Sequence, residues 1–430
     1  MKKFDCVIVG GGMVGAATAL TLAQLGLHIA LVEQFEPKTY STSQKLDLRV
    51  SAISIASQQL LEQLGTWSQV IKWRACPYKR LGVWEQSYAY TEFNADDIGQ
   101  KHLGHIVENR LLQLALWQQI KIQTNITLFC PYQLTNLSQE DSQVNLVLKN
   151  TTTLLETELT AKFLIASDGA NSQVRQMVDI GITAWDYKQS AMLINVKTEK
   201  PQQDITWQEF SPTGPVAFLP LTKPPTINSA LAPDDLLDSI RTEEKGSKNI
   251  VIEEGGYASL VWYHQRDEIK RLAALSNQQL QQEVMTAFPK RLGQVEVLDK
   301  GAFPLTRRHA NSYQNKRVLL LGDAAHTINP LAGQGVNLGF KDVKAIQTVI
   351  ASAIGNGECW HDINVLSRYE TMRRKDNLLM MSAMDGLYHS FSHPSLFAKT
   401  LRNMSLFAIN KVPFINTTIK NKALAYACGI

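Results

Sequence analysis

The amino-acid sequence predicts a mixed α/β (α+β) fold with two domains and a group of C-terminal helices. Two strand–loop–helix units with glycine-rich loops, at residues 4–33 and 318–353, indicate a parallel sheet of the nucleotide-binding type. Residues 181–300 read instead as short strands separated by turn residues, which is typical of an antiparallel sheet. At 430 residues the chain also exceeds one ordinary hydrophobic core, so two domains are expected.

The first unit begins with an apolar strand and continues into the loop G-x-G-x-x-G. Gly10 permits the turn, Gly12 lets a pyrophosphate approach the backbone, and Gly15 allows a helix to pack closely on the strand. Glu33, at the end of the next strand, can accept hydrogen bonds from a ribose that lacks a 2′-phosphate. The unit therefore predicts a Rossmann-like site for FAD or NAD rather than NADP. The alternative is a glycine-rich turn without a ligand.

The same region has a second interpretation. Residues 6–32 contain no Asp, Glu, Lys or Arg and are long enough to span a bilayer, and they follow Lys2-Lys3 as the core of a signal peptide would. Four glycines within residues 10–15, ahead of a helical pattern, favour a strand and a helix over one apolar helix. We therefore expect no transmembrane anchor.

The composition excludes some classes of protein. A net charge of +4, spread along the chain, is too small to indicate a nucleic-acid partner. The 5 cysteines form no C-x-x-C pair, which argues against a disulfide framework or a zinc site and favours a reducing compartment. We expect a cytoplasmic protein without a structural metal.

The second unit begins with an apolar strand at residues 318–321, which ends at Gly322 and Asp323. Small residues there let the backbone approach a ligand closely. A Gly-rich loop follows at residues 330–337, and then a helix with apolar residues at spacings of three and four. Free N–H groups and the positive dipole end of that helix favour an anionic group against the loop.

These residues resemble the second flavin motif of the flavoprotein aromatic hydroxylases, the p-hydroxybenzoate hydroxylase superfamily. The resemblance implies that Gly322 and Asp323 contact the ribityl chain of FAD and that the following loop caps the edge of the isoalloxazine ring. His326 is either a catalytic proton relay or a structural imidazole beside Asp323. The loop residues implied are Pro330, Gly333 and Gln334 in catalysis and Gly335 and Asn337 in cofactor binding.

Other side chains match flavin-contacting positions of the same superfamily, each with a structural alternative. The resemblance implies that Arg49, in a D-x-R segment, lies near the flavin diphosphate and that Arg110, at a helix start, contacts the flavin. Asp168 belongs to an Asp-Gly motif after an apolar strand and is implied in dinucleotide contacts. Arg175, seven residues on, is available to phosphates or to Asp168 itself.

Between residues 181 and 300 the apolar runs predict a substrate domain. Phe210, Phe218 and Trp262 would form an apolar wall suited to a flat ring with an isoprenoid tail, although core packing explains aromatic residues equally well. The segment at about 222–257 is an insertion relative to the superfamily, with a net charge of −3, and Pro233 could begin a short helix there. We assign it no function.

The C-terminal residues form an apolar, Met- and Phe-rich helical pattern. From Met380 to Ile430 there are five basic residues and one acidic residue, a net charge of +4. Such a segment suits an anionic membrane surface or a partner helix, and a covering layer over the flavin domain is equally consistent. We expect peripheral contact with the inner face of the cytoplasmic membrane or with a partner complex.

The domain boundaries follow from these changes in pattern. The FAD-binding domain is predicted at residues 1–75, 101–180 and 301–355, the substrate domain at 76–100 and 181–300, and the C-terminal helical segment at 356–430.

Several segments resemble one branch of the superfamily, the ubiquinone-biosynthesis hydroxylases. The resemblance implies an FAD monooxygenase that uses NAD(P)H and O₂, forms a flavin C4a-hydroperoxide and hydroxylates the ring of a polyprenylated methoxy-benzoquinol. The partner complex implied is a ubiquinone-biosynthesis complex. Three alternatives stay open: another ubiquinone precursor such as a polyprenyl phenol, a flavin reductase or dehydrogenase of the same fold, and a structural subunit of the ubiquinone-biosynthesis complex with a vestigial flavin. The segments that carry this resemblance are residues 184–185, 207–215, 259–263, 304–310 and 383–385.

Overall fold

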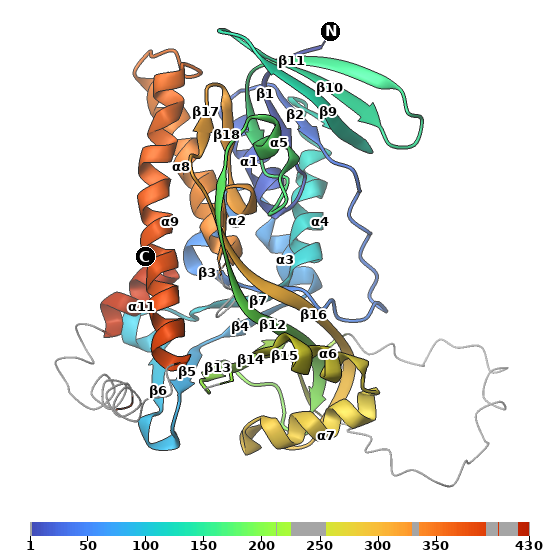
Figure 1. The fold of residues 1–430 in the computed structure, drawn as a ribbon, viewed down its shortest axis with the longest axis vertical. Coiled ribbons are helices and arrows are strands. Elements are labelled where there is room, and N and C mark those ends of the chain that lie inside the picture. The colour runs from blue at the N-terminus through green and yellow to red at the C-terminus, as the bar shows by residue number, and fades with distance from the viewer. Residues whose placement is uncertain are drawn as a thin grey trace, which may run out of the picture.

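A computed structural model describes residues 2–211, 213–224, 255–328, 335–392, 403 and 420–429, and the structure below is that of these residues. Most of the predicted insertion at 222–257, including the helix expected from Pro233, lies outside them. Figure 1 shows an elongated molecule with one sheet near the N-terminus and a second sheet at the opposite end.

The first sheet has eight strands in the order β17-β18-β11-β1-β2-β8, with β10 paired to β11 and β9 to β10. β1 pairs in parallel with both β2 and β11, and β11 pairs in parallel with β18, so the parallel sheet predicted from the two glycine-rich units is confirmed. The strands are β1 (Lys2–Val9), β2 (Ile29–Val32), β8 (Ile126–Phe129), β9 (Tyr132–Gln139), β10 (Val144–Asn150), β11 (Glu156–Ala166), β17 (Gln314–Asn315) and β18 (Val318–Leu320).

Helices cover this sheet, and α1 packs against both α4 and α8. The helices must approach closely, because a Cβ added at Gly339 of α8 would lie 2.4 Å from Val14 Cγ2 of α1. The helices of this part are α1 (Met13–Gln24), α2 (Ile55–Gln63), α3 (Trp67–Trp73), α4 (Asn109–Ile120), α5 (Gln173–Met177), the short η6 (Gly322–Ala324) and α8 (Gly335–Gly355).

The second sheet has eight strands in the order β19-β16-β12-β15-β14-β13-β5-β6, and most of its pairings are antiparallel, as predicted. The helices α6 (Arg266–Ala274) and α7 (Asn277–Ala287) lie at the end of the molecule away from the first sheet (Figure 1). The strands are β5 (Arg80–Trp84), β6 (Thr91–Asn94), β12 (Ile182–Thr198), β13 (Ile205–Glu209), β14 (Val216–Leu221), β15 (Gly256–Gln265), β16 (Val295–Ala310) and β19 (His326–Thr327).

A small third sheet lies between the other two, in the order β3-β7-β4. Its inward residues share a hydrophobic core with one face of the second sheet. The strands are β3 (Val50–Ser54), β4 (Ala75–Tyr78) and β7 (Gly104–Glu108), and the remaining short helices are η1 (Ser87–Ala89), η2 (Ala95–Ile98) and η5 (Lys290–Leu292).

The long strands β12 and β16 belong to the second sheet and extend from it toward the first sheet (Figure 1). The domain boundary expected at residue 300 falls inside β16. The helix α9 (Ile363–Ser392) lies within the predicted C-terminal helical segment, and its Leu366 and Tyr369 belong to the core of the first sheet. A short helix, α11 (Asn421–Cys428), follows near the C-terminus. None of the helices in the described part of the chain has the length and apolar character needed to cross a bilayer.

Two residues of the predicted apolar substrate wall, Phe218 and Trp262, lie instead in a hydrophobic core on one face of the second sheet. Phe218 stacks on Trp207, with ring centroids 5.5 Å apart and planes 7° from parallel, and Trp262 packs edge-to-face on Phe288 at 5.5 Å. Both rings are buried in the core that the sheet forms with α6 and α7. Successive side chains of a strand point to opposite faces, so these two face away from the flavin-binding side. Phe210, at the end of β13, is half-buried.

This packing generates a stability prediction. Phe218→Ala should lower the free energy of unfolding by about 3–5 kcal/mol, because it leaves a cavity between the sheet and α7. The KM for the organic substrate should stay close to that of the parent enzyme. Urea unfolding and steady-state kinetics measure the two quantities. A raised KM with unchanged stability would restore Phe218 to the substrate pocket.

Candidate active site

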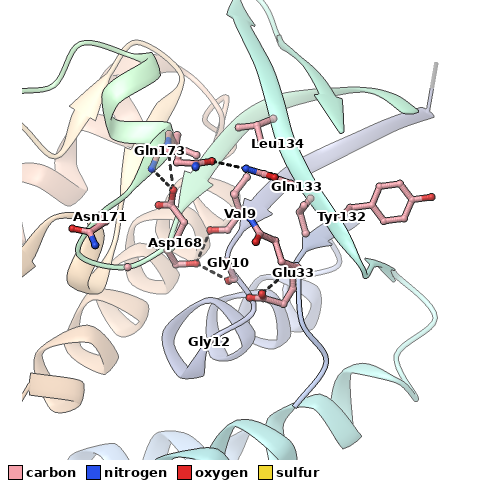
Figure 2. A pocket seen from close by; sticks show the side chains of 15 residues that line it. Val9, Gly10, Gly12, Glu33, Tyr132, Gln133, Leu134, Asp168, Asn171 and Gln173 are labelled. Atoms are coloured by element: carbon pink, nitrogen blue, oxygen red, sulfur yellow. Dashed lines mark hydrogen bonds between the residues drawn. The ribbon is translucent and has the colours of Figure 1, made fainter. Parts of the chain in front are cut away.

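A hollow of about 440 Å³ lies at the carboxyl ends of β1, β2 and β11 (Figure 2). In parallel sheets this edge is where nucleotides bind. Four separate segments of the chain reach it: the first glycine-rich loop, the end of β2, the start of β9 and the Asp-Gly motif after β11. The residues that line it are Val9, Gly10, Gly12, Val32, Glu33, Gln34, Tyr132, Gln133, Leu134, Ser167, Asp168, Gly169, Asn171, Gln173 and Val174.

Glycine occurs at three positions of the first loop for different physical reasons. Gly10 has φ +102°, and a Cβ there would lie 2.4 Å from the Ser167 carbonyl oxygen. A Cβ at Gly15 would lie 1.9 Å from the Gly10 oxygen. At Gly12 an added Cβ meets no protein atom within 4 Å, so packing within the chain does not explain this glycine. The open space faces the hollow, where a pyrophosphate would need it.

The N-terminus of α1 is also open to a ligand, since Gly12 is its N-cap and no side chain caps it. Unpaired N–H groups and the helix dipole favour an anion at that position. Sequence analysis missed the two side chains that hold the loop from α4: Gln113 and Trp117 both donate hydrogen bonds to the Gly11 carbonyl, at 2.9 and 2.8 Å. Their spacing of four residues, which places both on one helix face, was the available signal.

Glu33 lies beside this loop, as predicted. Its Oε2 accepts a hydrogen bond from the Gly11 N–H at 2.6 Å, and its Oε1 accepts one from Gln34 N–H at 2.7 Å and one from Phe35 N–H at 3.1 Å. The carboxylate is therefore held at the rim of the hollow, where a ribose hydroxyl can donate to it (Figure 2).

Asp168 faces the same hollow from the opposite side. Its Oδ2 accepts hydrogen bonds from the N–H groups of Gln173 and Val174, at 2.8 and 3.2 Å, at the start of α5. Its Oδ1 is buried without a partner among the described residues, and burial raises the pKa of this carboxyl. An unpartnered buried oxygen is costly, so a donor from a bound ligand fits there.

Arg175 joins two backbone segments. Its buried guanidinium donates hydrogen bonds to the carbonyl oxygens of Ala170, at 3.3 Å, and Ala324, at 2.9 Å. It therefore ties the Asp-Gly motif to the turn after β18 through backbone atoms. Asp168 acts on this guanidinium electrostatically, and the contact of Arg175 with a phosphate stays a prediction.

That turn is the helix η6, with Gly322 at φ +59° and Asp323 after it. The side chain of Asp323 is exposed, and no described residue makes a hydrogen bond with its carboxylate. Arg49 and His326 are close enough to act on it electrostatically. Asp323 is thus available to accept hydrogen bonds from ligand hydroxyls.

The carboxylate bonded to His326 is Asp342 of α8, and not Asp323. Nε2 of His326 lies 2.6 Å from Asp342 Oδ2, and both side chains are buried. Burial alone raises the pKa of Asp342, but His326 and Arg373 outweigh it and hold that pKa below its usual value. Sequence analysis missed Asp342, although a charged residue within the apolar stripe of a helix is a visible anomaly.

Asn337 and Arg110, both predicted to contact the cofactor, bind the protein with their side chains. Asn337 donates to the Ala52 carbonyl at 2.7 Å and accepts from Ser54 N–H at 3.0 Å, which fastens the start of α8 to β3. Arg110 Nε donates to Asp47 at 2.9 Å. Pro330, Gly333 and Gln334 lie outside the described residues.

Gly335 opens α8 and resembles Gly12 in one respect. Among the described residues, a Cβ added at Gly335 meets no atom within 4 Å. Elsewhere, Arg307 of β16 and Tyr187 of β12 both donate hydrogen bonds to Asp385 of α9.

The fold and this site define a flavin-binding oxidoreductase. Residues 3–376 match the family model described as the FAD binding domain, and the chain belongs to that family. Among solved structures it is similar to p-nitrophenol 4-monooxygenase PnpA from Pseudomonas putida DLL-E4, with a TM-score of 0.74, 17% identity, and coverage of 99% of this chain and 98% of that one. At this identity the likeness concerns the fold.

Relatives of higher sequence identity indicate a particular group within this class of enzymes. The chain is 42% identical over 426 residues to 3-demethoxyubiquinol 3-hydroxylase of Escherichia coli (strain K12), covering 99% of this chain and 98% of the relative. It is 32% identical over 462 residues to the mitochondrial ubiquinone biosynthesis monooxygenase COQ6 of Danio rerio, covering 99% and 90%. The chain is an FAD-dependent monooxygenase, and its predicted resemblance to the ubiquinone-biosynthesis hydroxylases is confirmed.

Gly12 provides a direct test of the first loop. Gly12→Val should fold normally, because the added atoms meet open space, but should occupy the position of the pyrophosphate. A clash of more than about 1.4 kcal/mol lowers affinity at least tenfold, so the purified variant should be pale. Flavin absorbance per protein is the measurement. Gly355→Val, at another glycine whose Cβ meets no atom, is the control and should stay as yellow as the parent.

Proposed function

We propose that this monooxygenase hydroxylates the ring of a polyprenylated methoxy-benzoquinol in ubiquinone biosynthesis, with NAD(P)H as reductant and O₂ as oxygen donor. The observation that carries the proposal is the 42% identity, over 99% of the chain, to a relative named for hydroxylation of demethoxyubiquinol. An electron-rich quinol ring is a suitable acceptor for an electrophilic oxygen, whereas a quinone ring is not.

The proposed substrate position is between the second and third sheets. The inner face of the second sheet presents small and apolar side chains there, together with the hydroxyl-bearing ring of Tyr263. A site of this kind suits an apolar ring with a tail that leaves along the protein surface. The inward residues that replace Phe218 and Trp262 in this role are Ala191, Ala217, Leu219, Val261, Tyr263 and Leu305.

Bound FAD supplies the redox chemistry by which NAD(P)H and O₂ are brought together with the quinol. The residues of the chain bind and orient it. Gly12 and the start of α1 hold the diphosphate, Glu33 and Asp168 accept hydrogen bonds from the adenosine half, and Asp323 accepts them from the ribityl hydroxyls.

We further propose that the loop at residues 330–337 caps the edge of the isoalloxazine ring of the flavin. In that position the start of α8 would favour negative charge on the ring, because the N-terminus of a helix carries a positive partial charge. Packed side chains around the ring would exclude water from it.

A test in cells separates this substrate from the alternatives. Deleting the gene should cause a ubiquinone precursor that lacks one ring oxygen to accumulate, and the intact chain should restore the normal quinone. Asp323→Ala should fail to restore it, because the variant loses an acceptor for the flavin. Asp267→Ala, at an exposed carboxylate on α6, is the matched control and should restore it fully.

Extraction and mass analysis of the quinones measure the result. Accumulation of an earlier polyprenyl phenol would favour the alternative precursor. An unchanged quinone profile in a deletion strain without a second hydroxylase of this type would overturn the proposal.

We also propose reversible contact of the C-terminal part with an anionic membrane. The net charge of +4 after residue 379 supports it, and so do the exposed apolar side chains of Leu379 on α9 and Tyr426 on α11, which are 66% and 52% exposed. A polyprenylated substrate would be met at such a surface.

Liposome flotation tests this contact. The enzyme should float with anionic vesicles at low salt and should be released at high salt, because screening weakens attraction between exposed charges. Neutral vesicles of the same size are the control. Equal flotation with neutral and anionic vesicles would contradict the electrostatic part.

A further inference from the structure

A buried carboxylate, Asp342, lies behind the turn that carries Asp323. Its Oδ2 accepts hydrogen bonds from the Gly322 N–H at 3.0 Å and from His326 Nε2 at 2.6 Å. Gly322 and His326 lie on either side of Asp323 in the sequence. One oxygen atom therefore holds the turn at both ends, before and after the residue that faces the ligand.

The other oxygen of Asp342 is held from α9. Its Oδ1 accepts hydrogen bonds from Arg373 Nε at 2.7 Å and from Asn377 Nδ2 at 3.4 Å. Asn377 also donates to the Tyr313 hydroxyl at 3.1 Å, so the contact continues into the core. Asp342 thus joins α8, α9 and the turn, because these four hydrogen-bond donors all lie outside its own helix.

Stability alone is a weak reason for this arrangement. Asp342 is fully buried and Arg373 is nearly so, and taking two charges out of water costs several kcal/mol. Well-packed apolar residues of similar volume often stabilise a core as well as a buried ion pair does. A fixed geometry is what the charged residues supply and apolar residues would not.

The geometry matters because Arg49 and His326 act on Asp323 only electrostatically. Its side chain is exposed and makes no hydrogen bond to a described residue, so its direction follows from the backbone of the turn. That backbone has Gly322 at φ +59°, a conformation that most residues adopt only at a cost. The hydrogen bond from Gly322 N–H to Asp342 fixes this part of the chain.

We propose that Asp342 is a positioning residue for the flavin, acting through the turn so that Asp323 is aimed at the ribityl hydroxyls, while Arg373 and Asn377 keep Asp342 in place. The inference rests on the proposed role of Asp323 as a flavin ligand. It assigns a role in cofactor binding to a residue that does not itself reach the cofactor.

A double-mutant cycle tests the coupling. Asp342→Asn keeps the shape of the side chain but loses its charge, and should raise the FAD dissociation constant of the holoenzyme about tenfold, measured by flavin fluorescence on dilution. Asp323→Ala should raise it as well. Since Asp342 acts through Asp323, the double variant should bind FAD no more weakly than Asp323→Ala alone.

A matched control removes a buried hydrogen bond that does not touch the turn. Tyr369→Phe loses the bond from the Tyr369 hydroxyl to the Leu320 carbonyl, 2.9 Å long, in the same core. It should lower thermal stability without changing the FAD dissociation constant. If Asp342→Asn does not fold, Arg373→Lys replaces it in the cycle, because it keeps the charge but loses the planar contact that holds Asp342.

The outcomes are distinct. Multiplicative effects of Asp342→Asn and Asp323→Ala on the dissociation constant would overturn the inference and leave the role of Asp323 intact. A tenfold weakening by Tyr369→Phe would also overturn it, since general loosening of the core would then explain the effect. Unchanged FAD binding in Asp323→Ala would overturn the proposed role of Asp323 and the inference together.

Discussion

The parallel pairing of β1 with β2 and β11 is the constraint on which the rest of the site depends. In this register Val9 lies beside both Val32 and Ala166, so the three strands end at one level. The residues that follow are a glycine-rich loop, Glu33 and the Asp-Gly motif, which are far apart in sequence. Backbone hydrogen bonds alone therefore bring together the groups that face the hollow.

The two faces of the second sheet pack against different parts of the protein. Alternation along β14 and β15 sends aromatic residues outward against α6 and α7, while smaller residues face the third sheet. The outer face packs on α6 and α7, and the inner face packs on the third sheet. Because β12 and β16 continue toward the first sheet, this inner face is fixed relative to the flavin site (Figure 1).

A cluster of buried charged residues lies behind the turn that carries Asp323. Asp342 accepts hydrogen bonds from groups on β19, α9 and the turn after β18, and its low pKa means that it stays ionised. Stability from a carboxylate with a depressed pKa is present above its ordinary pKa and is lost as the pH falls through the folded value. The contribution of Asp342 to stability is accordingly complete at neutral pH and lost only in acid.

Sequence by itself determined the parallel sheet, the glycine loop, the position of Glu33 and the cofactor class, because these depend on local periodicity and on spacing within one unit. It could not decide that Phe218 and Trp262 face away from the flavin, since the pattern reveals alternation but not which face meets which domain. Nor could it decide that His326 pairs with Asp342 rather than with Asp323. Asp323 is nearer in sequence, yet Asp342 is brought to the imidazole only when α8 packs against the strands, and that packing is a property of the tertiary structure.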